Sequence, residues 1–385
     1  MKIAVDARWI YPYISGIGAY TRELLRYLPV IDGSNSYIGL FDDKSVMART
    51  LRETSLEGRK NFRAVFLPYG PFSLSSQILL PRLLEREAVD VFHSPNYMIP
   101  FLAFPRHVPG RIRCVVTIHD LIPLVHPEYT PKAVKTRFHA VYKRVMYESA
   151  ARADLIIAVS ECSRNDIVEK LCDKKTDAGK IRTVYNGVSS FFTPASGQQG
   201  AGGAREGLVL YVGRADPYKN LPVLVRAFDM ALKRCDRHLA LRVVGPGDGR
   251  YPEAERLVRK LGLEEAVTWT GYVGDEALLS AYRNADVLVH PSKYEGFGLQ
   301  VLEAMACGTP VICSRAAALK EVAGDAAILV DSDDAGGFAD GIWKVLSDES
   351  LALSLRERGM KRASEFKWET AAEKTARIYG EIAER

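Results

Sequence analysis

The sequence predicts an α/β protein built from two doubly wound domains, each with a parallel sheet. The chain has 385 residues, more than one ordinary hydrophobic core contains, so two domains are expected. Short runs of Val, Ile and Leu recur without alternating polar residues, which is typical of strands buried on both faces. Amphipathic stretches between these runs complete the pattern of parallel sheets covered by helices.

Nine apolar runs are the strand candidates. They are residues 2–7, 114–119, 155–160, 181–186, 208–213, 239–245, 285–290, 310–314 and 326–330. Helical periodicity lies between them, for example from Leu221 to Lys233 and from Asp275 to Arg283. In doubly wound sheets, ligands bind beyond the carboxyl ends of the strands, so we expect the functional residues there.

One stretch breaks the alternation of strands and helices. Residues 189–206 are rich in Gly, Ser, Ala and Gln, and this composition predicts a flexible linker. We therefore place one Rossmann-like domain at residues 1–188 and a second at residues 207–366, followed by a helical segment at 367–385. With two such domains joined by a linker, the cleft between them is the expected active site.

The composition is that of a globular protein, with 47% hydrophobic and 26% charged residues. The six cysteines are scattered and form no CxxC pair, which favours reduced thiols in a cytoplasmic protein over disulfides or a zinc site. The first ten residues carry charges within their apolar run and predict a strand, not a signal peptide. The longest apolar runs fall short of the roughly 20 residues that a transmembrane helix needs.

Charge is distributed unevenly along the chain. Residues 1–188 contain 27 Lys and Arg against 19 Asp and Glu, whereas the remainder contains 25 against 28. A basic half favours an anionic partner, although a solvated basic face is the alternative. Within it, residues 131–150 predict a basic, aromatic, amphipathic helix that could lie on an anionic membrane or pack within the domain with its charges in water. The basic half lacks a recognised nucleic-acid-binding motif, so we expect no nucleic-acid partner.

A glycine-containing turn follows the first strand candidate in SGIGAYTRELL (15–25). Gly16 and Gly18 open a predicted helix whose amides could meet an anion, although a plain turn and helix start is the alternative. The motif has no third glycine and lies eight residues beyond the strand candidate. A nicotinamide dehydrogenase is disfavoured because no GxGxxG follows a strand with an acidic residue about 20 positions further on.

Two loops at later strand ends could also hold phosphate. In VGRADPYKN (212–220), Arg214 and Lys219 flank a turn, and two cations at a strand end suit a diphosphate. VVGPGDG (243–249) runs from a strand into a glycine-rich loop that allows close backbone approach. Solvated loops with ordinary turn chemistry explain either stretch equally well when it is taken alone.

KYEGFGLQVLEAMACGTPVICS (293–314) holds two carboxylates, Glu295 and Glu303, on either side of a helix start. Gly296 and Gly298 lie where the helix begins, so free amides and the helix dipole favour an anion. Glu303 lies among apolar residues and is costly to bury without a partner. Sugar or ribose hydroxyls are suitable partners because carboxylates accept hydrogen bonds from them.

Histidines and aspartates at strand ends complete the candidates. His119 ends the strand candidate at 114–119 and could contact a substrate hydroxyl or orient a leaving group, although a structural histidine is the alternative; His93 in a similar place carries less weight. Asp331 and Asp333 could hold a metal-bound nucleotide, but their position before a helical run favours helix capping. Cysteine and histidine spacing gives no ligand set, so no catalytic metal is expected.

Together these elements resemble glycosyltransferase family 4 (group 1), retaining enzymes with the GT-B fold of two Rossmann-like domains and an inter-domain cleft. The resemblance spans nearly the whole chain. Its most specific element is the pair of glutamates separated by seven residues, Glu295-GFGLQVL-Glu303, followed by AMACGTPVI. The VGR…KN element at 212–220, the glycine turn at 15–25 and the strand-end His119 match as well.

The resemblance implies a role for each matching position. Arg214 and Lys219 would bind the donor diphosphate, Glu303 the ribose, and Glu295 the donor sugar. The base would lie near residues 271–273, and the two glycines of the first turn would approach the diphosphate from the other domain. The implied catalytic residues are His119, Arg214, Lys219 and Glu295. The implied donor-binding residues are Gly16, Gly18, Arg214, Lys219, Tyr272, Val273, Glu295, Gly296, Phe297, Gly298, Leu299 and Glu303.

The resemblance also implies the reaction. The enzyme would move a hexose from a nucleoside-diphosphate sugar to a glycan or lipid-linked acceptor, with retained configuration and neither metal nor other cofactor. TIHDLIPLVHPEY (117–129), VDARWI and SGIGAYTREL are similar to bacterial mannosyltransferases of polysaccharide assembly, which favours GDP-mannose over a UDP-sugar. The acceptor would meet residues 1–188, and the segment 367–385 would cross back onto that domain. Peripheral contact with the inner face of the membrane would suit a lipid-linked acceptor.

Two other functions are compatible with the same motifs. A GT-B sugar-nucleotide epimerase would release diphosphate without transferring the sugar, and its product would need no acceptor. A regulatory module would bind the nucleotide sugar without turnover.

Overall fold

The computed structural model describes residues 1–13, 16–106, 110–132, 134–172, 178–195, 207–235 and 238–383. The chain divides into two compact units. Unit 1 comprises Met1–Val125, Val134–Gly187 and Lys367–Arg385, and unit 2 comprises His126–Ala133 and Val188–Phe366. Residues 196–206 of the predicted linker lie outside the described residues.

Unit 1 is organised around a parallel sheet with seven strands among its described residues. The strands are β1 (Lys2–Asp6), β2 (Ser36–Phe41), β3 (Phe62–Phe66), β4 (Val91–Ser94), β5 (Arg113–Ile118), β6 (Leu155–Ala158) and β7 (Ile181–Thr183). Their order is β3-β2-β1-β4-β5-β6-β7, so the chain reverses direction across the sheet beside β1. In register, Val5 pairs with His93, and His93 pairs with Val115.

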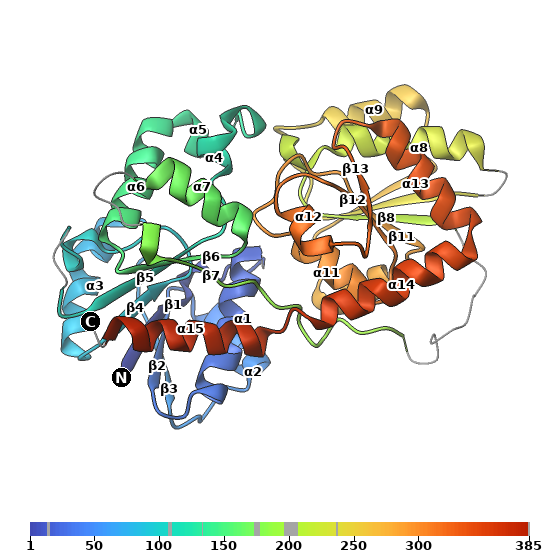
Figure 1. Cartoon of the computed structure of the whole chain (residues 1–385). Helices are drawn as coiled ribbons and strands as arrows, with labels where there is room; N and C mark the ends of the chain where they lie inside the picture. Colours follow the sequence, from blue (N-terminus) through green and yellow to red (C-terminus); the bar gives the residue numbers. More distant parts are fainter. Residues whose placement is uncertain are drawn as a thin grey trace. The chain divides into compact units, whose positions relative to one another are not determined.

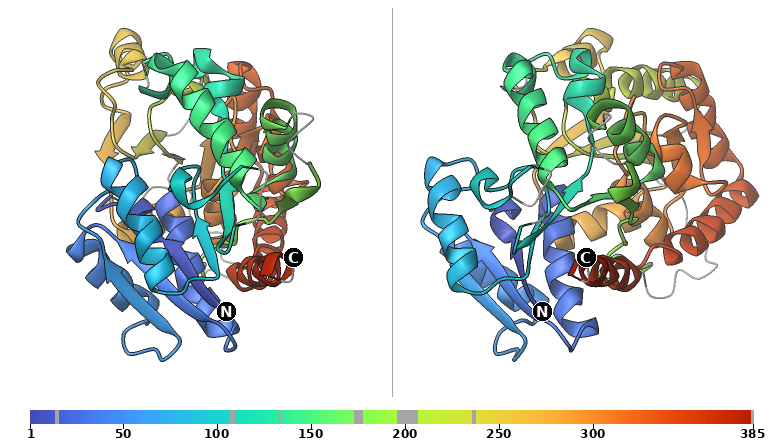
Figure 2. Two further views of the ribbon diagram at one scale, coloured as in Figure 1. Left: turned by 90° about the vertical axis from the view of Figure 1, so that its left-hand side faces the viewer. Right: turned by 60° about the vertical axis from the view of Figure 1, so that its left-hand side comes forward.

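Helices cover both faces of this sheet (Figures 1 and 2). They are α1 (Gly16–Ile31), α2 (Lys44–Thr54), α3 (Leu74–Arg86), α4 (Ile122–Val125), α5 (Val134–Arg137), α6 (His139–Arg152), α7 (Glu161–Leu171) and α15 (Trp368–Ala383), with short 3₁₀ turns η1 (Ala7–Trp9), η2 (Phe101–Ala103) and η4 (Ala178–Lys180). The last helix, α15, packs along α1 and reaches β5. Its buried residues, among them Trp368, Ala372, Thr375 and Tyr379, recur every three or four positions, so one stripe of the helix enters the core.

Unit 2 repeats the doubly wound arrangement on a parallel sheet with six strands in its described part. The strands are β8 (Leu208–Val212), β9 (Ala240–Val244), β10 (Val267–Gly271), β11 (Val287–His290), β12 (Val311–Ser314) and β13 (Ile328–Val330). Their order is β10-β9-β8-β11-β12-β13. β8 therefore has the place in this sheet that β1 has in the other, and β11 has the place of β4.

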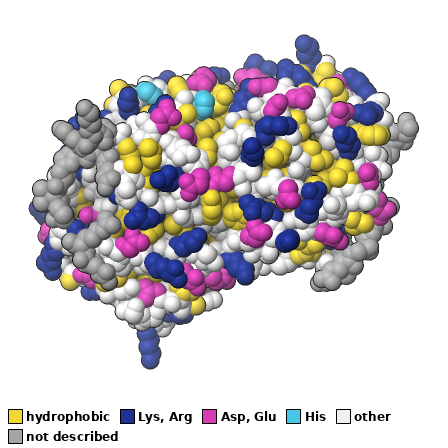
Figure 3. All heavy atoms as spheres, viewed as in Figure 1, with side chains coloured by type: hydrophobic (Ala, Val, Ile, Leu, Met, Phe, Trp, Pro, Cys, Tyr) yellow, Lys and Arg dark blue, Asp and Glu magenta, His cyan; other side chains and the backbone are white. Residues whose placement is uncertain are grey.

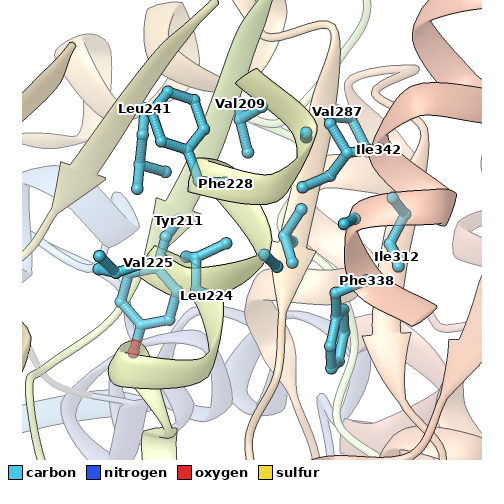
Figure 4. Close-up of a cluster of buried hydrophobic side chains, with 14 of the residues drawn as sticks. Val209, Tyr211, Leu224, Val225, Phe228, Leu241, Val287, Ile312, Phe338 and Ile342 are labelled. Atoms are coloured by element: carbon cyan, nitrogen blue, oxygen red, sulfur yellow. The ribbon is translucent and has the colours of Figure 1, made fainter. Parts of the chain in front are cut away.

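The helices of unit 2 are α8 (Leu221–Arg234), α9 (Glu253–Leu261), α10 (Asp275–Asn284), α11 (Leu299–Ala306), α12 (Ala318–Ala323), α13 (Ala335–Ser347) and α14 (Glu349–Ser364), with 3₁₀ turns η3 (Pro127–Tyr129) and η5 (Pro217–Lys219). α8 packs against α13, and Leu224 and Phe228 enter the core beside Phe338 and Ile342. Figure 4 shows this cluster, with the Tyr211 hydroxyl pointing away from the aliphatic side chains.

The structure confirms all nine strand candidates, with ends that differ by one to three residues. Four further strands, β2, β3, β4 and β10, were not among the candidates. β3 and β10 are outer strands of their sheets and consist mainly of partly buried and exposed residues, so neither has a continuous buried run.

The basic stretch 131–150 is not one continuous helix. It forms α5 and α6, and Ala133 lies outside the described residues. Tyr142, Met146 and Ala150 on α6 are buried in the core of unit 1. One face of α6 therefore packs within its domain, and Val141, Lys143 and Arg144 on the rest of the helix stay exposed.

Charges of both signs cover the face drawn in Figure 3, where Lys and Arg side chains alternate with Asp and Glu and apolar side chains lie between them. The basic surplus does not form a patch of one sign on this face. No helix in the described part of the chain is long and apolar enough to cross a bilayer.

Candidate active site

Three glycines bring the ends of β8, β9 and β10 into contact. The Gly213 amide donates to the Val244 carbonyl over 2.9 Å, and the Gly245 amide donates to the Gly271 carbonyl over 2.9 Å. A Cβ at Gly245 would lie 2.1 Å from the Gly213 carbonyl oxygen, so only glycine allows this approach. The loops that follow these strands therefore begin side by side, beyond the carboxyl edge of the sheet.

The first of these loops carries the two predicted diphosphate cations. Arg214 makes a forked ion pair with Asp216, with Nε–Oδ2 and Nη2–Oδ1 distances of 2.9 and 3.0 Å. The Arg214 side chain is 57% exposed, so its guanidinium is accessible although one carboxylate already engages it. Lys219 ends η5 and is buried.

Lys219 and Glu295 form a buried ion pair at the centre of the site. The Lys219 Nζ atom lies 2.6 Å from Glu295 Oε1, and His290 Nε2 lies 2.9 Å from the same oxygen. Burial by itself would raise the pKa of the Glu295 carboxyl, but the Lys219 charge and the His290 hydrogen bond outweigh it and lower that pKa to about 2. Glu295 is therefore ionised throughout the physiological pH range.

Backbone and side-chain hydrogen bonds hold these loops together. The Lys293 amide donates to the Tyr218 carbonyl over 2.7 Å, which fixes the loop before Glu295 against the loop that carries Lys219. Asn220 has a left-handed backbone (φ 59°), and its side-chain amide donates to the Ser332 carbonyl over 2.6 Å. The ion pair is thus fixed by its surroundings as well as by its own charges.

The start of α11 is shaped by Gly298, which has a φ of 103°. A Cβ there would lie 2.6 Å from Leu319 Cδ2, so both the backbone and the packing require glycine. The Phe297 side chain is buried and makes an edge-on contact with Phe366. At Phe297, the predicted donor contact can therefore come only from the backbone.

Glu303 has a partner within the protein. Tyr282 on α10 is fully buried, and its hydroxyl donates to Glu303 Oε2 over 2.7 Å. Glu303 itself is only partly buried. A tyrosine from the preceding helix therefore supplies a partner for one oxygen of this carboxylate, and the ribose contact expected for Glu303 stays a prediction.

The remaining predicted donor residues of unit 2 line the adjoining loop ends. Tyr272 follows β10 and is 42% exposed, and Val273 is partly buried. Asp331 and Asp333 do not cap α13: Asp334 accepts from the Gly337 amide over 2.8 Å, while Asp331 and Asp333 pair with Arg315 and Lys293.

Unit 1 holds the other three predicted residues. Gly16 is the first residue of α1 and is exposed, and Gly18 is buried in its first turn. His119 follows β5 and lies with its Nε2 atom 2.8 Å from the Pro95 carbonyl, so Nε2 carries the proton. Its ring packs edge-on against Tyr20 at 4.8 Å between centroids. The roles expected for these residues stay predictions.

The structure adds three residues that were not singled out in the sequence: Asp216, Tyr282 and His290. Asp216 could have been found because it lies two residues after Arg214 in the same loop. His290 stands at the end of a strand five residues before Glu295, the same signal that pointed to His119. Tyr282 gave no local signal. Among the described residues, no group of three or more His, Cys, Asp or Glu side chains could hold a metal ion.

Solved structures share the fold of this chain. Sucrose-phosphate synthase from Thermosynechococcus elongatus matches with a TM-score of 0.75 and 24% identity over 99% of both chains. Anabaena HepE in complex with UDP and glucose matches with a TM-score of 0.75 and 20% identity over 99% of this chain and 100% of that one. The GT-B fold class predicted from the sequence is confirmed.

The sequence comparisons establish the family. The Glycosyltransferase Family 4 profile matches residues 14–190, and the Glycosyl transferases group 1 profile matches residues 198–362. The chain is also 31% identical over 395 residues to the O-antigen chain mannosyltransferase B of Escherichia coli, across 98% of this chain and 99% of that protein. The protein belongs to glycosyltransferase family 4 and is a glycosyltransferase.

Proposed function

We propose that this enzyme transfers mannose from GDP-mannose to a glycan or lipid-linked saccharide, with retained configuration and without a metal ion. The observation that carries the proposal is the buried Lys219–Glu295 pair beside the exposed Arg214, at the strand ends of unit 2. It combines cations for a diphosphate with a carboxylate for sugar hydroxyls. The relative named O-antigen chain mannosyltransferase B supports mannose, and the structure determined with UDP and glucose makes a UDP-sugar the alternative donor.

The two cations act on the leaving group. Transfer breaks the bond between the anomeric carbon and a diphosphate oxygen, and negative charge collects on that diphosphate. Arg214 can turn its guanidinium from Asp216 to a phosphate, because the side chain is largely exposed. The Lys219 ammonium has three donors and makes one hydrogen bond to Glu295, so it can hold phosphate while it stays paired.

The two glutamates act on the hydroxyl-rich ends of the donor. Glu295 accepts hydrogen bonds from the sugar, and Glu303, oriented by Tyr282, accepts hydrogen bonds from the ribose. The acceptor hydroxyl attacks the same face from which the diphosphate leaves, and a diphosphate oxygen takes its proton. The new bond then has the configuration of the old one, and the two cations stabilise the negative charge of the departing diphosphate.

The exposed side of α6 is the surface through which we propose contact with an anionic membrane. Phe138 and Val141 are 60% and 62% exposed, and Lys143 and Arg144 are exposed beside them. Such a surface could bring a cytoplasmic enzyme to a lipid-linked acceptor. Flotation with anionic liposomes at low salt tests this part, and a protein that does not float would remove it without touching the rest.

Calorimetric binding of GDP, UDP, ADP and TDP in EDTA tests the central proposal. We expect GDP to bind, and Glu303→Ala and Arg214→Ala to weaken it, because the first removes the ribose contact and the second a phosphate contact. Incubation with GDP-mannose then separates the reaction classes. A product that forms without any acceptor would indicate an epimerase, and nucleotide binding that depends on a divalent cation would overturn metal independence.

A further inference from the structure

His290 is a fully buried histidine at the end of β11 that has no role in the function described so far. Its side chain is 0% exposed and its Nε2 atom lies 2.9 Å from Glu295 Oε1 and 3.2 Å from Ser292 Oγ. A carboxylate only accepts hydrogen bonds, so Nε2 carries the proton and donates to Glu295. Burial lowers the pKa of His290, which therefore donates as a neutral imidazole and leaves the charge of the ion pair balanced.

The two oxygens of Glu295 are used unequally. Oε1 accepts from both Lys219, at 2.6 Å, and His290, at 2.9 Å. Oε2 accepts no hydrogen bond from any described residue, and the Glu295 side chain is 10% exposed. Two donors on one oxygen fix the carboxylate plane, and they leave the second oxygen open for a ligand hydroxyl.

The imidazole ring is itself held in place. The Tyr211 ring stacks on it at 6.0 Å between centroids and 11° between planes. The Tyr211 hydroxyl donates to the Arg214 carbonyl over 2.9 Å, so one buried tyrosine supports both His290 and the loop of the first diphosphate cation. His290 is thus held by packing against Tyr211, which also supports the loop that carries Arg214.

The other ring nitrogen shows that this arrangement is not optimised for stability. His290 Nδ1 is buried and has no hydrogen-bond partner among the described residues. An unmade hydrogen bond at a buried polar atom is unfavourable for folding, and an apolar ring of the same shape would avoid it. Retaining a histidine here is understandable if the hydrogen bond from Nε2 serves the site.

We propose that His290 is a positioning residue that sets the selectivity for the donor sugar by fixing the Glu295 carboxylate. The inference rests on the proposed function, in which Glu295 binds the sugar of a nucleotide sugar. Without His290, Glu295 keeps only Lys219 as a partner and can turn about that contact. Glu295 Oε2 then has no single position. The enzyme therefore discriminates less between sugars that differ in the configuration of one hydroxyl.

Two substitutions separate the hydrogen bond from the packing. His290→Phe keeps an aromatic ring against Tyr211 and removes the donor, whereas His290→Gln restores an N–H donor without the ring. We expect His290→Phe to lower kcat with GDP-mannose about 10- to 100-fold, with a much smaller change in KM. The preference for GDP-mannose over GDP-glucose should fall about 10-fold, and His290→Gln should recover most of both losses.

Binding of free GDP and a double substitution complete the test. GDP lacks the sugar, so its affinity should stay within about twofold in His290→Phe. Because His290 acts through Glu295, adding His290→Phe to Glu295→Gln should lower kcat little further. His93→Gln, which changes a buried histidine of unit 1, is the control for general destabilisation and should leave the GDP-mannose to GDP-glucose ratio unchanged.

The outcomes distinguish the inference from the function on which it rests. Independent, multiplicative losses in the double variant, or an unchanged sugar preference in a folded His290→Phe protein, would overturn the role of His290 alone. If the wild-type chain uses UDP-sugars as donors, the sugar preference of the His290 variants is measured with UDP-mannose and UDP-glucose instead, and the same outcomes apply. A wild-type chain that neither binds a nucleoside diphosphate nor transfers a sugar would overturn both.

Discussion

β4 of unit 1 and β11 of unit 2 occupy the same place in their sheets, next to the first strand of the unit, and both carry a fully buried histidine. His93 has a hydroxyl at each nitrogen: Tyr379 lies 2.6 Å from Nδ1 and Thr117 lies 2.8 Å from Nε2. His290 has a carboxylate at one nitrogen and no partner in the described structure at the other. The position in the fold and the burial are alike, and only the partners differ.

The partners of His93 join the last helix of the chain to the sheet. Tyr379 is on α15, and Thr117 Oγ1 lies 2.9 Å from the Tyr20 hydroxyl of α1. All four groups are buried and their hydrogen bonds are made between uncharged groups. In unit 1 the strand-end histidine therefore stabilises the packing of two helices, whereas in unit 2 it serves an ion pair. We expect changes to the His93 hydrogen bonds to alter stability, and changes to those of His290 to alter activity as well.

Lys219→Ala should have the largest effect. It leaves the Glu295 carboxylate buried without its cation, and it removes a charge from the leaving diphosphate. We expect sugar transfer to slow by about 10²–10³-fold, as when a preorganised oxyanion donor is lost. The free energy of unfolding should fall by about 3–5 kcal/mol. Initial rates with GDP-mannose and denaturant unfolding measure the two effects.

Lys233→Ala is the matched control for that variant. Lys233 also pairs with a carboxylate, Asp229, at 2.7 Å, but its side chain is 70% exposed. An exposed pair one helical turn apart contributes less than about 0.5 kcal/mol, and this one lies outside the proposed site. If the two variants behaved alike, the Lys219–Glu295 pair would be no more than surface charge.

The acid sensitivity of unit 1 is the next effect in size. Burial lowers the pKa of His93 to about 3, well below the usual value near 6.5. Between about pH 6.5 and 3, His93 is therefore protonated in the unfolded chain but not in the folded chain. The stability that the folded protein has above about pH 6.5 is lost as the pH falls towards 3. His93→Gln should make the fall in unfolding free energy shallower by about 1.4 kcal/mol per pH unit in this window.

Comparison with unit 2 sharpens this prediction. Burial also lowers the pKa of His290, but the Glu295 hydrogen bond opposes the shift. Replacing His290 should therefore change the acid slope less than replacing His93 does. Denaturant unfolding of both variants at several pH values between about 6.5 and 4.5 provides the comparison. An equal change in the two slopes would mean that the Glu295 carboxylate does not raise the pKa of the His290 imidazole.

The sequence predicts a strand where a buried apolar run is unbroken. β8 and β11 are buried throughout, so their Val and Leu runs are unbroken and identify them. β2 and β4 are buried as well, but Gly39 interrupts the run of one and His93 and Ser94 end the run of the other, so neither was a candidate. β10 lies at the edge of its sheet and alternates between buried and exposed residues over only five positions. Such a pattern is too short to separate an edge strand from a loop before its partner strand is known.

The sequence predicts which loops carry the residues of the site, but it does not predict which residues of different loops contact one another. Arg214, Lys219 and Glu295 stand in short motifs whose chemistry is readable in sequence, but the ion pair between Lys219 and Glu295 was not predicted. Which carboxylate meets which cation depends on how the strand ends are aligned, because Lys219 and Glu295 are 76 residues apart. Tyr282 shows the same limit: nothing around it in sequence indicates that its hydroxyl will meet Glu303.

Two tyrosine hydroxyls provide the smallest and most discriminating comparison. Tyr379→Phe removes a hydroxyl from His93, and Tyr282→Phe removes one from Glu303; both side chains are fully buried and keep their rings. The first should lower the unfolding free energy by about 1 kcal/mol and leave GDP affinity unchanged, because its partner is structural. The second should weaken GDP binding by about two- to fivefold, because it frees the carboxylate that we propose binds the ribose. Calorimetry and thermal melting of both variants test this, and a loss of GDP affinity in Tyr379→Phe as large as in Tyr282→Phe would show that the two units do not divide stability and binding in this way.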